Sequence, residues 1–304
     1  MRTSTLRADV LLLITAAIWG FAFAAQRVGM EHVGPFTYTG VRFALGSLSL
    51  VPLVLRDRGA CAPAPDPAGR RLFLLGGGAI GLVLFAAASL QQVGLLYTTA
   101  GKAGFITGLY VVIVPFFGLL RRHRLPSATL VGAGLAAVGL YLLSVTESLR
   151  IEPGDLLVLV GAFFWSAHVL LIGWLSPQVR PVHLACYQFG ICAALALGVA
   201  FCCEPVRWST IRAAALPILY GGVLSVGIAY TLQVVAQREA HPAHASILMS
   251  LEAVFAALGG WIVLRERLSS RALAGCAFML AGMLVSQSRH PSMPRPARDA
   301  GTAR

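Results

Sequence analysis

Long apolar stretches separated by short polar segments run through most of the chain. Two of these stretches contain a single charge each: 32–55 holds Arg42, and 240–264 holds Glu252. The charge-free stretches are 10–26, 72–101, 103–120, 125–146, 156–179, 181–203, 213–237 and 272–288. Because about 20 apolar residues make one helix that crosses the hydrocarbon core, the pattern predicts ten membrane spans.

These stretches are expected to be helices, because a backbone in lipid must satisfy its hydrogen bonds within the segment or within a closed barrel. Barrel strands would alternate polar and apolar positions, and the chain shows no such alternation. The predicted class is therefore all-α integral membrane. We expect the helices at 10–30, 35–55, 72–95, 101–120, 127–146, 154–174, 181–201, 213–235, 243–264 and 270–288.

Composition supports a membrane protein and argues against a soluble globular enzyme. Hydrophobic residues make up 57% of the 304 residues and charged residues only 12%, about half the usual charged share of a soluble domain. The six cysteines form no CxxC pair. We therefore expect neither a disulfide framework nor a zinc site, and no cofactor.

The positive charge follows the distribution found in multi-pass membrane proteins. Lys and Arg number 24 against 12 acidic residues, and they occur in short clusters between the apolar stretches. Under the positive-inside rule the clusters place both termini in the cytoplasm, with stronger support from the first half of the chain. We expect a bacterial inner-membrane location, contact with membrane lipids and no nucleic-acid partner.

The chain is similar to itself. A shift of 146 positions superposes 9–43 on 155–189, and a shift of 143 superposes Arg122 and Arg124 on Arg265 and Arg267. The first shift aligns Asp9 with Asp155, Trp19 with Trp165, Pro35 with Pro181 and Phe43 with Phe189. This predicts a five-helix repeat at 9–146, a second at 154–288 and a basic, disordered tail at 289–304. Since five is odd, the repeats would be inverted in the membrane, an arrangement common in transporters.

Four segments also resemble the EamA-type members of the drug/metabolite transporter superfamily. They are Trp19-Gly20, Arg42-Phe43, Tyr97 to Leu120 and Gly227 to Leu268. The resemblance covers about 9–288. It implies ten helices in two halves, cytoplasmic termini and the movement of small metabolites, often in exchange for protons. One departure is that Ala253, where family members commonly have Pro, follows Glu252.

Glu252 and Arg42 are the main candidate site residues. A carboxylate inside a span is costly to keep ionised and can avoid part of that cost by binding a proton, which is what proton coupling needs. Arg42 cannot lose its charge and should face a wet cavity, an acidic partner or a substrate anion. The alternative for Glu252 is that it pairs with an arginine or a backbone donor and only orders the bundle, and the alternative for Arg42 is likewise a role in bundle structure. A buried pair between Arg42 and Glu252 is one such arrangement. Gln188, the repeat equivalent of Arg42, is a candidate neutral contact.

Several polar and aromatic residues inside spans are further candidates for substrate binding, with ordinary helix packing as the alternative for each. Trp19 and Trp165 lie away from the interface where tryptophan is usual, and His168 follows Trp165 by one turn. The others are Gln92, Tyr110, Tyr230 and Gln233. A metal site at His241 and His244 is not favoured, because Glu239 is the only further ligand nearby. Lys102 is expected to anchor the start of its span.

The sequence thus favours a secondary transporter, expected to be a proton-coupled exporter of small metabolites such as amino acids or related compounds. Its partners would be the solute, protons and lipids, with a homodimer as an option. The alternatives are an integral-membrane enzyme or a scaffold for lipid-linked substrates. Against an enzyme, no Walker loop, HExxH helix or nucleophile elbow is present.

Overall fold

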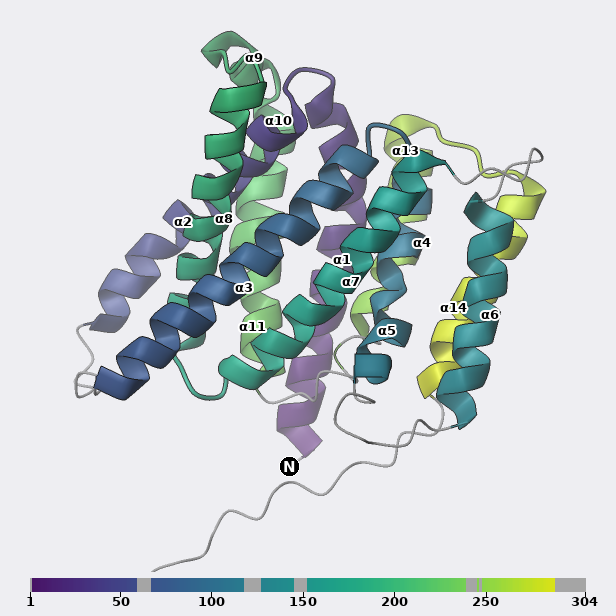
Figure 1. Ribbon diagram of the computed structural model, residues 1–304, viewed down its shortest axis with the longest axis horizontal. Coiled ribbons are helices and arrows are strands. Elements are labelled where there is room, and N and C mark those ends of the chain that lie inside the picture. The colour runs from purple at the N-terminus through teal and green to yellow at the C-terminus, as the bar shows by residue number, and fades with distance from the viewer. Residues whose placement is uncertain are drawn as a thin grey trace, which may run out of the picture.

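The computed structural model describes residues 2–58, 67–117, 127–144, 152–238, 245 and 248–287, and the regular elements within these ranges are all helices (Figure 1). They are α1 (Arg2–Met30), α2 (Pro35–Arg58), α3 (Pro67–Gly94), α4 (Ala100–Gly108), α5 (Tyr110–Phe117), α6 (Ser127–Ser144), α7 (Pro153–Leu175), α8 (Pro181–Cys203), α9 (Trp208–Ala213), α10 (Ala215–Leu219), the π-helix η2 (Tyr220–Tyr230), α11 (Thr231–Gln237), α13 (Glu252–Leu264) and α14 (Ser270–Gln287). The all-helical prediction is confirmed for the described residues. The tail at 289–304, the candidates Glu239, His241 and His244, and the repeat matches Arg122 and Arg124 lie outside them.

Six helical segments are long and apolar enough to cross a membrane. They are Leu6–Met30, Pro35–Asp57, Pro67–Gly94, Pro153–Leu175, Pro181–Cys203 and Ala215–Gln237. Shorter apolar helices occupy the other four predicted spans, at Ala100–Val114, Leu130–Leu142, Leu248–Leu264 and Ser270–Val285. The described residues therefore support six spans by length, and the count of ten stays a prediction.

Proline starts four of the long helices. Pro35, Pro67, Pro153 and Pro181 are the first residues of α2, α3, α7 and α8. Proline suits this position because it lacks the N–H that would have no partner in the first turn, and its φ is already helical. The short helix α4 instead begins after Thr99, whose side chain accepts a hydrogen bond from the Lys102 N–H at 3.2 Å.

Three pairs of described helices that the internal repeat makes equivalent, α2–α8, α4–α13 and α6–α14, pack side by side and antiparallel. In the α6–α14 pair, a Cβ on Gly139 would overlap the Gly275 carbonyl, and a Cβ on Gly282 would overlap the Gly132 carbonyl. The end of each helix therefore lies against the beginning of the other, as it does in α2–α8 and in α4–α13. Figure 1 shows α6 and α14 together at one side of the bundle. Such antiparallel pairs are expected of inverted repeats.

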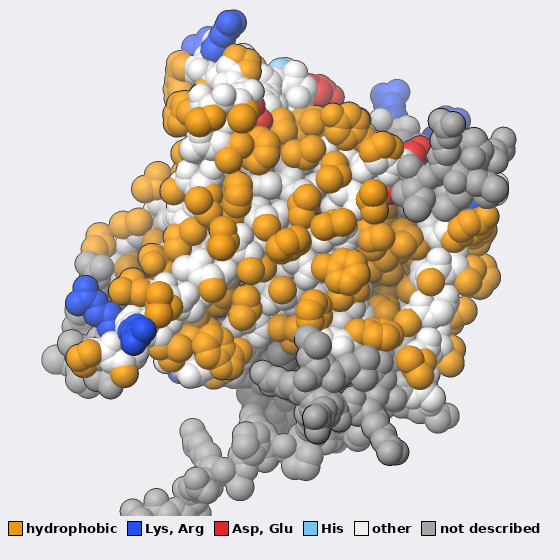
Figure 2. Space-filling view, viewed as in Figure 1, with side chains coloured by type: hydrophobic (Ala, Val, Ile, Leu, Met, Phe, Trp, Pro, Cys, Tyr) orange, Lys and Arg blue, Asp and Glu red, His pale blue; other side chains and the backbone are white. Residues whose placement is uncertain are grey.

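The outside of the bundle is apolar. Large hydrophobic side chains such as Leu75, Phe163 and Trp261 are exposed. In Figure 2 hydrophobic side chains cover most of the face in view, and charged side chains lie at its upper and lower-left margins. An apolar belt between charged margins is the surface that a lipid bilayer covers.

Two equivalent helices are interrupted near the centre of the bundle. The predicted span at 101–120 is divided at Leu109, where α4 ends and α5 begins. The predicted span at 243–264 has a turn at Leu251, immediately before α13. A shift of 143 aligns Leu109 with Glu252, so the two interruptions fall within one residue of equivalent positions. The predicted spans do not specify these local turns, which the structure adds within the two apolar helices.

Candidate functional site

A small cavity lies at the centre of the bundle, between the two halves of the chain. Its volume is about 40 Å³, which is room for about three water molecules. The lining residues come from both halves and are Trp19, Ala22, Phe23, Gln26, Arg42, Gln91, Thr107, Tyr110, Trp165, Val169, Ser225, Tyr230, Gln233, Met249 and Glu252.

Most of the residues proposed from the sequence line this cavity. They are Trp19, Arg42, Tyr110, Trp165, Tyr230, Gln233 and Glu252. Gln92, His168 and Gln188 are fully buried but are not among the lining residues. The His168 Nε2 lies 2.8 Å from the Gln188 Oε1, so these two side chains form a hydrogen bond with each other. A role in transport stays a prediction for all ten residues.

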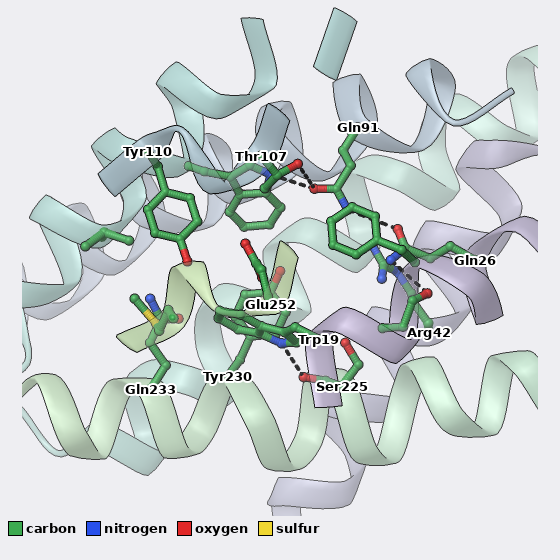
Figure 3. A pocket seen from close by; sticks show the side chains of 15 residues that line it. Trp19, Gln26, Arg42, Gln91, Thr107, Tyr110, Ser225, Tyr230, Gln233 and Glu252 are labelled. Carbon is green, nitrogen blue, oxygen red and sulfur yellow. Dashed lines mark hydrogen bonds between the residues drawn. The ribbon is translucent and has the colours of Figure 1, made fainter. Parts of the chain in front are cut away.

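Glu252 begins α13, and its side chain points into the cavity. The residue is only 3% exposed, and its Oε1 has no hydrogen-bond partner among the described residues. A close contact between α1 and α13 fixes its position, because a Cβ on Gly20 would overlap Phe255 and the Glu252 carbonyl. In Figure 3 the carboxylate lies near the centre of the view, with the Tyr110 hydroxyl facing it from one side.

Arg42 enters the same cavity from α2. It is 2% exposed, and its guanidinium lies over the rings of Phe43, at 5.0 Å, and Tyr38, at 5.6 Å. Such cation–π contacts partly replace the water that a buried guanidinium loses. The structure has no ion pair between Arg42 and Glu252, although both line the cavity. The two side chains thus share the cavity without an ion pair in this structure, and the role of each stays a prediction.

Aromatic rings surround Tyr230, at the end of the π-helix. The Tyr230 ring centroid lies 4.5 Å from that of Trp19 and 6.0 Å from that of Trp165. The Trp19 indole donates a hydrogen bond to the Ser225 carbonyl at 3.2 Å, which ties α1 to η2. The two tryptophans that the repeat aligns therefore both contact one tyrosine. Flat aromatic faces beside a carboxylate are suited to a cationic or aromatic group.

A polar wall that sequence reasoning missed runs along the cavity. The Gln91 side chain donates to the Gln26 Oε1 at 3.2 Å, and its oxygen accepts from the Trp165 indole at 2.9 Å and from the Thr107 hydroxyl at 3.5 Å (Figure 3). A shift of 141 positions aligns Gln92 with Gln233 and so favours Gln92, but its neighbour Gln91 lines the cavity. Helical spacing was the signal that the sequence offered, because it puts Gln91 on the same face as the small residues Ala87 and Gly94. In the structure Gly94 of this face packs on α7.

Two other predicted features can be placed. Lys102 lies in the first turn of α4, where its Nζ is 2.9 Å from a Glu152 carboxylate oxygen and 3.7 Å from an Asp155 oxygen, and its role as an anchor stays a prediction. Within the described ranges, no three His, Cys, Asp or Glu side chains come together as metal ligands could.

Comparison with known proteins identifies the family. The sequence profile of the EamA-like transporter family matches twice, at 6–145 and 152–287. An uncharacterized transporter of Archaeoglobus fulgidus is 31% identical over 93% of this chain and 87% of its own length. The uncharacterized transporter YoaV of Bacillus subtilis is 20% identical over 90% of this chain and 94% of its own length.

A solved crystal structure has the same fold. It superposes with a TM-score of 0.68 and 20% sequence identity, over 92% of this chain and 96% of that one. The two family matches fall on the two halves that the internal repeat defines and together cover most of the chain. The chain therefore belongs to the EamA-like transporter family and is a multi-pass membrane transporter.

Proposed function

We propose that this protein is a proton-coupled exporter of small zwitterionic metabolites, such as amino acids or related compounds, across the bacterial inner membrane. In this proposal ten helices span the membrane as two inverted repeats with both termini in the cytoplasm. The observation that carries the proposal is that one buried arginine and one buried carboxylate face the same small cavity without pairing with each other.

The unpaired polar groups of the cavity support a polar ligand. Among the described residues, Arg42 Nε, Glu252 Oε1 and both polar atoms of the Gln233 amide have no hydrogen-bond partner. Leaving a buried polar group without a partner costs about 1–3 kcal/mol, and more for a charged group. A solute that brings a carboxylate and an ammonium would satisfy these groups together with the water it does not displace.

The charges of the cavity suggest how a zwitterion would bind. Its carboxylate would face Arg42, which always carries a positive charge. Its ammonium would face the Glu252 carboxylate and the rings of Trp19 and Tyr230. Such a complex is electrically neutral, which limits the cost of holding charges inside the membrane.

A proton can replace the solute at Glu252. When the solute leaves, the carboxylate loses its counterion, and binding a proton removes the cost of a lone buried charge. Export would then alternate a solute-bound state, with Glu252 ionised, and a proton-bound state. The protein would open outward with the solute bound and return to the inward-open state with a proton bound. Proton entry from outside would therefore drive solute exit.

The cavity must enlarge before such a solute enters. Room for about three water molecules is too little for an amino acid, so the described conformation is a contracted one. The interrupted helices beside the cavity, at Leu109 and Leu251, provide places where it can expand. Interrupted helices near the midplane are a recurring feature of transporter binding sites.

Comparative metabolite profiling tests the proposal and identifies the solute. Cells with the intact protein, cells with Glu252→Gln and cells without the protein would be compared for metabolites in medium and cytoplasm. We expect zwitterionic metabolites to move to the medium only with the intact protein. Gly134→Ala is a control variant that should keep export, because Gly134 does not line the cavity and a Cβ there meets no neighbour within 4 Å. Identical metabolite profiles in all these cells, with the intact protein and Glu252→Gln present at equal levels, would refute the proposal.

A further inference from the structure

One short segment of the first half, Thr98 to Lys102, is held by three acidic residues of the second half. The Thr98 hydroxyl donates to Asp155, and Lys102 pairs with Glu152 and Asp155. The Ala100 and Gly101 N–H groups donate to the Glu266 carboxylate at 2.9 and 3.1 Å. This segment, which we call the latch segment (98–102), starts α4 at the upper end of the bundle in Figure 1.

Glu266 reaches the latch segment because α13 ends in a tight reversal. Arg265 adopts the left-handed conformation, with a φ of 55°. The Glu266 N–H then donates to the Gly260 carbonyl at 3.0 Å, which folds the residue back along its own helix. Its carboxylate accepts two N–H groups at the positive end of α4, where a negative charge is favourable.

The helix that starts at the latch segment ends beside the cavity. Helix α4 is nine residues long and ends at Leu109, where the span is interrupted beside the cavity. Its face toward α13 is made of small residues, since a Cβ on Gly104 would overlap Ala256 and one on Gly101 would touch Ala257. Small residues on both sides let the two helices pack closely. The polar contacts at 98–102 add a directional restraint at this end of α4.

Helices α2 and α8, which the repeat makes equivalent to each other, have polar contacts at both ends of their pair. At the upper end the Glu204 carboxylate accepts the Phe36 and Thr37 N–H groups, each at 2.8 Å. At the lower end Asp57 lies 3.4 Å from both Arg180 and His183. Polar contacts at both ends suit a static frame, and breakable polar contacts at the start of a helix that lines the cavity suit a gate.

We propose that α4 is the gate at the upper end of the cavity, that it hinges at Leu109, and that Glu266 and Lys102 hold it closed in the described conformation. This inference rests on the proposed transport function for its purpose but not for its test. In the orientation proposed above, the latch segment faces the outside of the cell, so release of the latch would open the cavity outward.

Thiol labelling tests the gate without requiring a known solute. A single cysteine, Thr107→Cys, would be placed in the cavity wall of a variant whose six native cysteines are replaced. A membrane-impermeant maleimide added from the latch side would measure how often the cavity opens there. We expect Glu266→Gln to raise the labelling rate about tenfold, the effect of about 1.4 kcal/mol in the closed state. Lys102→Gln, which cuts the other link, should also raise it.

Two controls separate gating from charge and from the frame. Glu31→Gln removes an exposed acid at the same end, and Glu204→Gln loosens α2–α8; neither should raise the labelling rate. Unchanged labelling in both latch variants, or an equal rise with Glu31→Gln, would overturn the gate. If labelling rises as expected but no solute crosses proteoliposomes in any variant, the gate stands and the proposed function fails.

Discussion

Arg42 and Glu252 determine the charge of the cavity, and each has a different freedom to change it. Arg42 stays positive whatever is bound, and the rings of Tyr38 and Phe43 hold its guanidinium in place. Glu252 can be neutral or negative. The cavity is therefore neutral or carries one positive charge, and both states favour a ligand with a carboxylate.

We predict that Arg42→Gln removes the preference for carboxylate-bearing solutes. In the intact protein a solute should bind at least about tenfold more tightly than its decarboxylated amine, because a hydrogen-bonded charge pair is worth about 1.5–3 kcal/mol. The measurement is competition by both compounds in a binding assay on purified protein. Equal discrimination in Arg42→Gln and the intact protein would place the solute carboxylate elsewhere.

Gln91 and Gln92 form a matched pair of neighbouring amides with opposite predictions. Gln91→Leu leaves the Trp165 indole and the Gln26 side chain without their partner and should cost about 1–3 kcal/mol in stability, with a loss of transport. Gln92→Leu removes an amide whose atoms have no partner among the described residues and should be neutral or stabilising. Thermal unfolding in detergent measures both. A Gln92→Leu variant that is the less stable of the two would contradict this account of the polar wall.

The same pair shows how far sequence reasoning reaches at the residue scale. A charge in an otherwise apolar span stands out, which is why the pattern alone identifies Arg42 and Glu252. Amides do not stand out in this way, and a match between repeats reports common origin rather than the direction of a side chain. Which of two adjacent glutamines faces the cavity depends on the rotation of α3 about its axis, and that rotation is set by packing on α7.

At the scale of elements, glycines set how closely the paired helices approach. Gly139 of α6 meets the backbone of α14, whereas a Cβ added to Gly134 of the same helix would have no neighbour within 4 Å. Close backbone contact of this kind is the usual source of helix association in lipid. The α6–α14 pair therefore depends on particular glycines and not on glycine content.

Alanine at these two glycines should have opposite effects on stability. Gly139→Ala must push α14 away and should destabilise the protein by about 1–3 kcal/mol. Gly134→Ala meets no neighbour and should stabilise α6 by up to about 1 kcal/mol, because alanine favours the helical backbone. Thermal unfolding of both variants under one detergent condition is the measurement. Equal changes of the same sign would contradict the described packing.

Element positions followed from the sequence better than element continuity did. The long apolar windows predicted the helices, and the prolines at their starts agree with the observed ends of α2, α3, α7 and α8. The interruptions at Leu109 and Leu251 have no proline at the break and leave hydropathy unchanged. A one-residue turn inside an apolar stretch changes neither its length nor its polarity, so the pattern along the chain does not reveal it.

At the scale of the whole molecule, two similar halves enclose one site that neither half could form alone. Arg42 comes from the first half and Glu252 from the second, and the polar wall joins Gln91 of the first to Trp165 of the second. Relative movement of the halves therefore changes the site itself. This links access to the cavity with the groups that bind the solute and the proton.

Proton movement during solute exchange tests the central claim most directly. Proteoliposomes loaded with a pH-sensitive dye would receive the zwitterionic solute identified by profiling, and internal pH would be followed as the solute crosses. We predict that solute entry moves protons outward in the intact protein, and that Glu252→Gln exchanges solute for solute with no proton movement. Equal proton movement in Glu252→Gln, or solute transport without proton movement in the intact protein, would contradict the account.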